Sequence, residues 1–202
     1  MKKSLIIGML GMAVLATQTY GQGFIALDNY DSTASPLVTY GPNTGGTVGT
    51  GINTAGWTVG IYFAQGGVAG SVGADATGTA DPSTLGGGLA LASGPGSTAA
   101  IYTSTFNTPG KFFTPNTFQA SAAVGSTITL EVVAYNGANY LSSGMRGHST
   151  AFTMTTAAGN APTPNFVGDS MPTFSVFVVP EPSVFALAGL GGAFLMMIRR
   201  KK

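Results

Sequence analysis

Between residues 22 and 178, short apolar stretches alternate with clusters of Gly, Pro, Asn and Ser. The clearest alternation runs along Thr127–Tyr135, where Ile128, Leu130 and Val132 are separated by residues that are mostly polar. A second one covers residues 57–64. Because successive side chains of a strand point to opposite faces of its sheet, this period of two predicts strands with at least one buried face.

The same pattern predicts an all-β body of short strands. Turn sequences such as Asn136-Gly137 separate the apolar stretches, and no stretch of the body keeps the 3.6-residue period of a helix. Nothing repeats at a fixed period, which argues against a solenoid. We expect an antiparallel β-sandwich or jelly roll, with residues 41–56 as a long loop or mobile flap. The predicted strands are residues 24–27, 37–40, 57–64, 99–103, 112–113 with 118–121, 127–135, 150–156 and 173–179.

Charge is scarce and unevenly placed. The body has two basic residues, Lys111 and Arg146, and six acidic ones, so it carries a net charge of −4, while most of the positive charge lies at the two ends of the chain. Nucleic-acid binding needs clustered Lys and Arg, so it is not expected here. The absence of Cys excludes disulfides and thiolate chemistry, and a single His leaves little for zinc. We expect no cofactor and no metal.

Residues 1–21 have the parts of a secretory signal peptide. Lys2 and Lys3 precede an apolar run over residues 5–16, which is too short to span a bilayer comfortably. Cleavage between Gly21 and Gln22 would leave small residues in the positions that signal peptidase reads. We predict export, with signal peptidase and the export machinery as partners; the alternative is an uncleaved N-terminal anchor.

Residues 179–202 also have three parts. Pro180-Glu181-Pro182 is followed by an apolar run over residues 184–198. A helix of this length reaches about 22 Å at 1.5 Å per residue, and snorkelling of the basic residues after it can extend it across the membrane. Positive charges hold such an end in the cytoplasm. The basic tail consists of Arg199, Arg200, Lys201 and Lys202.

This end resembles a PEP-CTERM sorting signal, which joins the same three parts in the same order. The resemblance implies recognition by an exosortase, a membrane-embedded, cysteine transpeptidase-like enzyme of Gram-negative bacteria that also make exopolysaccharide. Two prolines hold the segment extended, as a protease groove requires, and Glu181 offers it a charge. The alternative is a plain tail anchor with a proline-rich hinge.

The body also loosely resembles secreted PEP-CTERM proteins of verrucomicrobial type. In those proteins, segments like Gln22-Gly23-Phe24-Ile25 and Arg146-Gly147-His148 stand in the same order before the sorting end. This likeness supports a sandwich and implies no chemistry.

The candidate chemical motifs of the body are weak. Gly168-Asp169-Ser170-Met171 resembles the nucleophile block of GDSL lipases, but it comes late in the chain and lacks the following His, so a loop is favoured. His148 is expected in a surface loop. Asp28-Asn29-Tyr30-Asp31 favours a turn over a calcium loop, and Gly49-Thr50-Gly51 favours a loop over a phosphate site.

Aromatic residues leave one binding hypothesis open. They could form a sugar-stacking face, although alternating strands place most such rings in a core or at its rim. The residues are Trp57, Tyr62, Tyr102, Tyr135 and Tyr140.

The sequence therefore predicts three segments: a signal peptide at 1–21, a body at 22–178 and a sorting signal at 179–202. We expect a non-enzymatic protein, anchored transiently in the inner membrane and then released to the cell surface or extracellular matrix. Its role would be structural or adhesive and linked to exopolysaccharide; the alternative is a carbohydrate-binding module for that polysaccharide.

Overall fold

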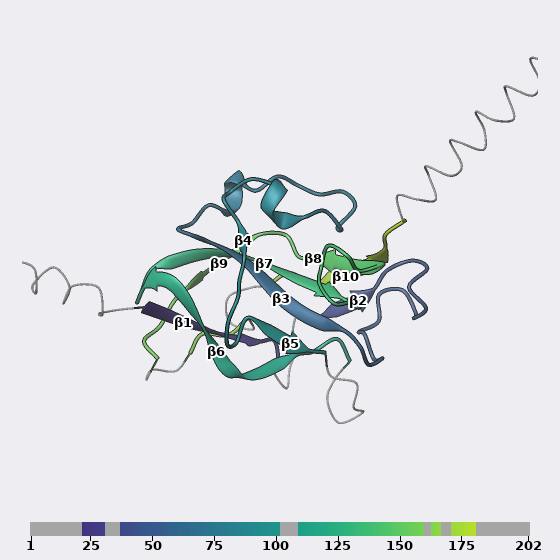
Figure 1. The fold of residues 1–202 in the computed structure, drawn as a ribbon, viewed down its shortest axis with the longest axis horizontal. Coiled ribbons are helices and arrows are strands. Elements are labelled where there is room, and N and C mark those ends of the chain that lie inside the picture. The colour runs from purple at the N-terminus through teal and green to yellow at the C-terminus, as the bar shows by residue number, and fades with distance from the viewer. Residues whose placement is uncertain (1–21, 31–36, 102–108, 160–162, 167–170, 181–202) are drawn as a thin grey trace, which may run out of the picture.

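The computed structural model describes residues 22–30, 37–101, 109–159, 163–166 and 171–180. They form two β-sheets with two single turns of 3-10 helix, η1 (Ala69–Ser71) and η2 (Pro82–Thr84) (Figure 1). The strands are β1 (Gln22–Asp28), β2 (Val38–Tyr40), β3 (Thr58–Gln65), β4 (Ala90–Leu91), β5 (Thr98–Ala100), β6 (Phe113–Ala123), β7 (Thr127–Tyr135), β8 (Met145–His148), β9 (Phe152–Thr155) and β10 (Phe174–Val178).

The larger sheet is built around β3 and β7. These two strands pair antiparallel over their whole length, from Thr58 opposite Tyr135 to Gln65 opposite Ile128. The sheet has the order β2-β10-β8-β7-β3-β4, with β5 pairing with β3 and β9 pairing with β7. The smaller sheet contains β1 and β6.

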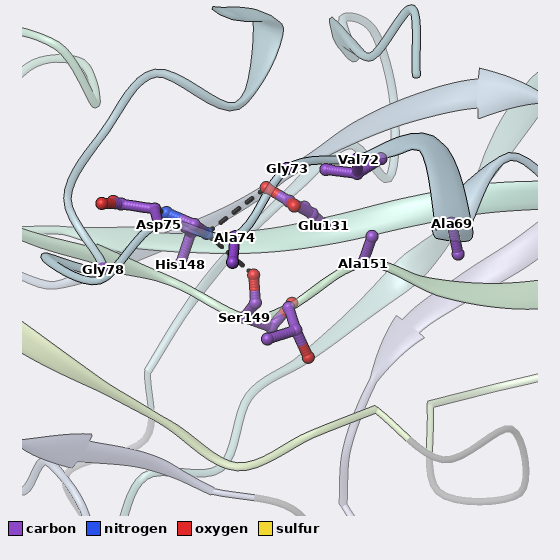
Figure 2. A pocket seen from close by; sticks show the side chains of 11 residues that line it. Ala69, Val72, Gly73, Ala74, Asp75, Gly78, Glu131, His148, Ser149 and Ala151 are labelled. Carbon is purple, nitrogen blue, oxygen red and sulfur yellow. Dashed lines mark hydrogen bonds and ion pairs between the residues drawn. The ribbon is translucent and has the colours of Figure 1, made fainter. Parts of the chain in front are cut away.

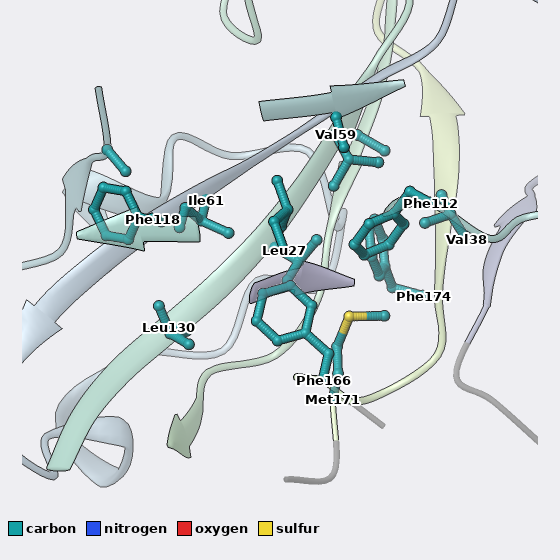
Figure 3. Close-up of a cluster of buried hydrophobic side chains, with 14 of the residues drawn as sticks. Leu27, Val38, Val59, Ile61, Phe112, Phe118, Leu130, Phe166, Met171 and Phe174 are labelled. Atoms are coloured by element: carbon teal, nitrogen blue, oxygen red, sulfur yellow. The ribbon is translucent and has the colours of Figure 1, made fainter. Parts of the chain in front are cut away.

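The main core lies between the two sheets. Side chains at alternate positions of β3 and β7 face inward, and Ile25 and Leu27 of β1 meet them from the other side. Figure 3 shows this cluster, in which Phe112 and Phe166 pack edge to face with ring centroids 6.0 Å apart. Full burial of one such side chain contributes about 1.5–3 kcal/mol, so this cluster is the main source of stability of the body.

The opposite face of the larger sheet is covered by residues 66–89, which we call the covering segment (Figure 1). Its Leu89 is buried with Tyr62 and Val133, and its Val68 N–H donates to Thr129 Oγ1 at 2.8 Å. All the central residues of β7 are therefore buried on both faces. Glu131 of β7 is among the residues buried on the face under the covering segment.

The all-β class is confirmed, and each predicted strand overlaps one in the structure. The prediction of an antiparallel sheet is wrong for β2 and β10, which run parallel. The two short strands β4 and β8 were not predicted, because neither has an apolar alternation long enough to recognise. The predicted break between residues 113 and 118 is absent: β6 continues through Pro115, which lies at a register irregularity opposite β1, where a missing N–H costs no ladder hydrogen bond.

The segment over residues 41–56 is anchored to β2 by backbone hydrogen bonds. Ile52, with no exposed surface, donates to Val38 at 3.0 Å, and Tyr40 donates to Thr50 at 2.9 Å. The expectation of a long loop over residues 41–56 is therefore confirmed, because no strand or helix lies between β2 and β3, and this packing does not fit the alternative of a mobile flap.

A close approach of three backbones leaves no room for a side chain at Gly110. Its φ is +81°, and a Cβ on it would lie 2.4 Å from the carbonyl oxygen of Val38 and 2.9 Å from the Cα of Gly51. We expect Gly110→Ala to lower the free energy of unfolding by about 1–3 kcal/mol more than Gly125→Ala does. Gly125 is the matched control, because it has a φ of +76° but open space around the Cβ position. Urea unfolding of both variants checks this, and equal losses would contradict the close packing.

The two predicted terminal segments fall largely outside the described residues. Residues 1–21 and 181–202 are not described, so the signal peptide and the C-terminal helix stay predictions. Within the described part of the chain, no helix is long and apolar enough to cross a membrane.

Candidate functional site

The predicted sorting segment, residues 179–202, begins where the last strand of the body ends. Val178 is the final residue of β10 and pairs with Met145 of β8. The next residue, Val179, still donates its N–H to the carbonyl oxygen of Gly144 at 2.8 Å, and Pro180 is exposed. The chain thus leaves the sheet at the first proline of Pro180-Glu181-Pro182.

The remaining predicted sorting residues are not described. These are Glu181, Pro182, Arg199, Arg200, Lys201 and Lys202, together with Gly21 at the predicted signal cleavage. Gln22, on the other side of that cleavage, is the exposed first residue of β1 and pairs with Ala123. Cleavage before Gln22 would therefore leave the first strand whole.

A buried charged cluster lies on the covered face of the larger sheet. It joins three elements: His148 ends β8, Glu131 lies in the middle of β7, and Asp75 belongs to the covering segment. His148 Nε2 lies 3.1 Å from Asp75 Oδ2, and His148 Nδ1 lies 3.3 Å from Glu131 Oε2. His148 is only 8% exposed, so the expectation of a surface loop is wrong: β8 pairs with β7 and places the ring beneath the covering segment.

Asp75 is held by a ring of donors within its own loop. Its two oxygens accept hydrogen bonds from the backbone N–H groups of Thr77, Thr79 and Ala80 and from the Thr77 hydroxyl. Burial by itself would raise the pKa of Asp75, but the hydrogen bonds from Ala80 and Thr77 outweigh it and hold the pKa well below its usual range. The carboxylate of Asp75 is therefore a negative partner for His148 at neutral pH.

His148 is an imidazolium in this environment. Burial by itself would lower its pKa, but Glu131, the Ser149 carbonyl and Asp75 outweigh burial and raise the pKa to about 9. Both ring nitrogens have acceptors, since Nδ1 also lies 2.8 Å from the Ser149 carbonyl oxygen. A general base needs a free ring nitrogen facing its substrate, so this geometry suits a clamp between sheet and covering segment better than acid–base catalysis.

Arg146 ties the same segment to the sheet. Its Nε donates to the carbonyl oxygen of Thr79 at 2.9 Å, and its guanidinium lies over the ring of Tyr140, 5.2 Å from the centroid. It also donates to the carbonyl oxygens of Tyr140 and Leu141. The alternate residues 146 and 148 of β8 thus both hold residues of the covering segment.

A cavity of about 230 Å³ adjoins the cluster (Figure 2). Its walls come from the covering segment, from β7 and from the turn between β8 and β9. The polar side chains among them include Asp75, Glu131, His148 and Thr150, and the rest of the lining is made mainly of Ala, Val and Gly.

The other predicted sites are structural or lie outside the described residues. Asn29 is fully buried, with its side chain bonded to the backbone of Gly110 and Phe112, and Tyr30 N–H donates to Asp28 Oδ1 at 2.6 Å, which fits a turn. Ser170 is not described, and Met171 belongs to the main core. No group of three side chains arranged to hold a metal ion occurs among the described residues.

The aromatic rings do not share one exposed face. Trp57 belongs to the main core, while Tyr62 and Tyr140 belong to the buried cluster on the opposite face, where they pack edge to face at 6.3 Å. Tyr135 lies against Tyr140 in the same way, and Tyr102 is not described. The described rings follow the core interpretation rather than forming a sugar-stacking platform.

The cluster predicts a specific pH dependence of stability. A pKa of His148 raised from 6.5 to about 9 stabilises the fold fully below pH 6.5, and this contribution is lost as pH rises through 9. The lowered pKa of Asp75 stabilises the fold above its usual value of 3.8 and is lost below it. Both contributions are complete between pH 3.8 and pH 6.5, so we expect the free energy of unfolding, measured by urea titration, to be highest in that range.

His148→Gln is the control for that pH dependence. It keeps a polar side chain that does not titrate, so the fall in stability between pH 6.5 and 9 should disappear. A fall of equal size in the variant would assign the effect to another group.

Comparison with known proteins identifies the end of the chain alone. No curated protein and no solved structure matches this sequence. Residues 178–201 match the family model of the PEP-CTERM protein-sorting motif, which begins at the last residue of β10. The body therefore leads directly into a PEP-CTERM sorting motif, which implies export and membrane-associated processing by an exosortase.

Proposed function

We propose that this is an exported structural or adhesive protein of the cell surface or extracellular matrix, working beside exopolysaccharide and without enzymatic activity. Its signal peptide is removed before Gln22, and the sorting segment holds it in the inner membrane until an exosortase releases the body. Residues 22–178 are then the part of the chain that is released, and residues 179–202 are the signal that directs its sorting.

One observation carries the proposal: the sorting motif begins at Val178, where the sheet ends. Of this segment the structure describes Val179, whose N–H donates to the carbonyl oxygen of Gly144, and Pro180, which is exposed. Cleavage after that point would sever no strand, so the released body keeps its two sheets. A segment that an enzyme must bind in extended form has to be separable from the fold in this way.

The non-enzymatic part of the proposal rests on the buried cluster and on the surface. His148 is engaged on both ring nitrogens. The two basic residues of the body are also engaged, since Lys111 is 3% exposed and Arg146 binds three carbonyl oxygens. Among the described residues, the exposed positions are rich in Gly, Ser and Thr and include no Lys or Arg, which suits a protein embedded in hydrated polysaccharide.

Two epitope tags in one chain test this processing. One tag follows Lys202, and the other is inserted after Ala55, an exposed residue between β2 and β3. In a host with an exosortase, we expect the Ala55 tag on a shortened chain outside the inner membrane and the Lys202 tag absent from that chain. In the same host without exosortase, both tags should stay together in the membrane.

The two hosts separate processing from export. Both tags on one full-length membrane chain in the exosortase host would refute the proposal and favour a plain tail anchor. Both tags on one cytoplasmic chain would refute export itself.

A further inference from the structure

Glu131 is a buried residue with one carboxylate oxygen that accepts no hydrogen bond. The residue is 1% exposed, and its Oε2 is buried without a hydrogen-bond partner among the described residues. Its one polar contact is the 3.3 Å approach to His148 Nδ1, whose acceptor at 2.8 Å is the Ser149 carbonyl oxygen. Leaving a charged group without donors in a protein interior is costly, so such groups are normally satisfied.

Asp75, on the other side of the same imidazolium, differs in this respect. Its oxygens accept from three backbone N–H groups and a hydroxyl. Two carboxylates share the one positive charge of His148, so the cluster has one negative charge in excess. The excess lies at Glu131, because Asp75 has its own donors.

The side chain of Glu131 forms part of the cavity wall (Figure 2). Apolar groups of the covering segment, Ala69 and Val72, line the same cavity as Ala151 of the turn before β9. Gly73, Ala74 and Thr150 are exposed, so the cavity can be reached from solvent without unfolding the covering segment. Its volume of about 230 Å³ lies below the range of pockets for drug-sized ligands, about 300–1,000 Å³.

We propose that this cavity binds a primary alkylammonium group, with the ammonium on the carboxylate of Glu131 and the alkyl part against Ala69, Val72 and Ala151. An ammonium brings three donors and the positive charge that the cluster lacks. A neutral polyol would leave the charge unbalanced, and the described lining of the cavity includes no Phe, Tyr or Trp ring for it to stack on. The ammonium belongs either to a free amine or to a lysine side chain of a partner.

The single histidine of the chain reports on this site directly. We would follow its ring proton signals by NMR in the full-length protein in detergent, during titration with n-butylammonium at neutral pH. The signals should shift and saturate at millimolar amine, whereas the isosteric n-butanol should leave them unchanged. Nα-acetyl-lysine methylamide distinguishes a lysine side chain from a free amine, with its norleucine counterpart as the uncharged control. If the lysine compound binds more tightly than butylammonium, the site is assigned to a lysine side chain. If it binds more weakly, the site is assigned to a free amine.

Three variants make the test specific. Glu131→Gln removes the charge, and Ala151→Leu fills the cavity while keeping every charged group; each should weaken amine binding at least tenfold. Ala123→Leu, the same change at an exposed position of β6, should bind as the wild type does. If Glu131→Gln does not fold, Ala151→Leu decides alone.

Three outcomes would overturn the proposal. The first is a histidine signal that saturating butylammonium leaves in place. The second is an equal response to butanol, which would mean that the charge of the ligand is irrelevant. The third is an Ala151→Leu protein that still binds the amine with wild-type affinity.

Discussion

Replacing Glu181 with Ala should leave the protein in the membrane as an uncleaved chain. Glu181 is the only charged residue between Asp169 and Arg199, and the two prolines beside it favour an extended backbone. A charge-assisted contact contributes about 1.5–3 kcal/mol, so its loss should slow recognition by about ten- to a hundredfold. Pulse-chase labelling of the full-length and shortened chains measures this rate.

Ser183→Ala is the control for Glu181→Ala. It changes a neighbouring side chain without removing a charge, and should be processed at the wild-type rate. Both variants keep the apolar run and the basic tail, so both should reach the membrane. Wild-type processing of Glu181→Ala would mean that Pro180-Glu181-Pro182 is only a hinge.

Deleting residues 199–202 should abolish retention rather than recognition. These four residues are the only positive charges that follow the apolar run, and positive charges hold a membrane-spanning end in the cytoplasm. Without them we expect unprocessed chain to slip through the membrane and appear outside the cell with its C-terminus intact. An epitope tag fused directly after Ile198 of the deleted chain, detected in the medium, measures this loss.

The matched control replaces Arg199 and Arg200 with Lys, which keeps all four charges. This variant should be retained and processed as the wild type is, because the positive-inside effect depends on charge. Normal retention of the deleted chain would show that the tail has no anchoring role.

The strands were predictable where apolar residues alternate regularly along the sequence. Thr127–Tyr135 shows this, since its predicted bounds match β7. The parallel pairing of β2 with β10 joins residues about 135 positions apart, and nothing in either short stretch encodes the direction of its partner. The strand β8 has Arg146 and His148 where an apolar alternation would be expected, so it does not resemble a strand.

The charged cluster of Asp75, Glu131 and His148 could not be predicted from the sequence for a related reason. Glu131 is the one charged residue of the predicted strand over residues 127–135, and that is the signal in the sequence that could have drawn attention to the site. Its partners lie 17 positions later, at His148, and in a Gly-rich stretch, at Asp75, whose donors are mostly backbone groups. Only the fold, which lays the covering segment over the sheet, brings the three together.

The mass of the mature protein tests the central claim most directly. Intact-mass spectrometry of the chain recovered from the cell surface or medium of an exosortase host should give a product that begins at Gln22 and lacks the tail Arg199–Lys202, and the product should be absent when the exosortase is deleted. Recovery of a chain that keeps residues 199–202, whether or not exosortase is present, would contradict the account.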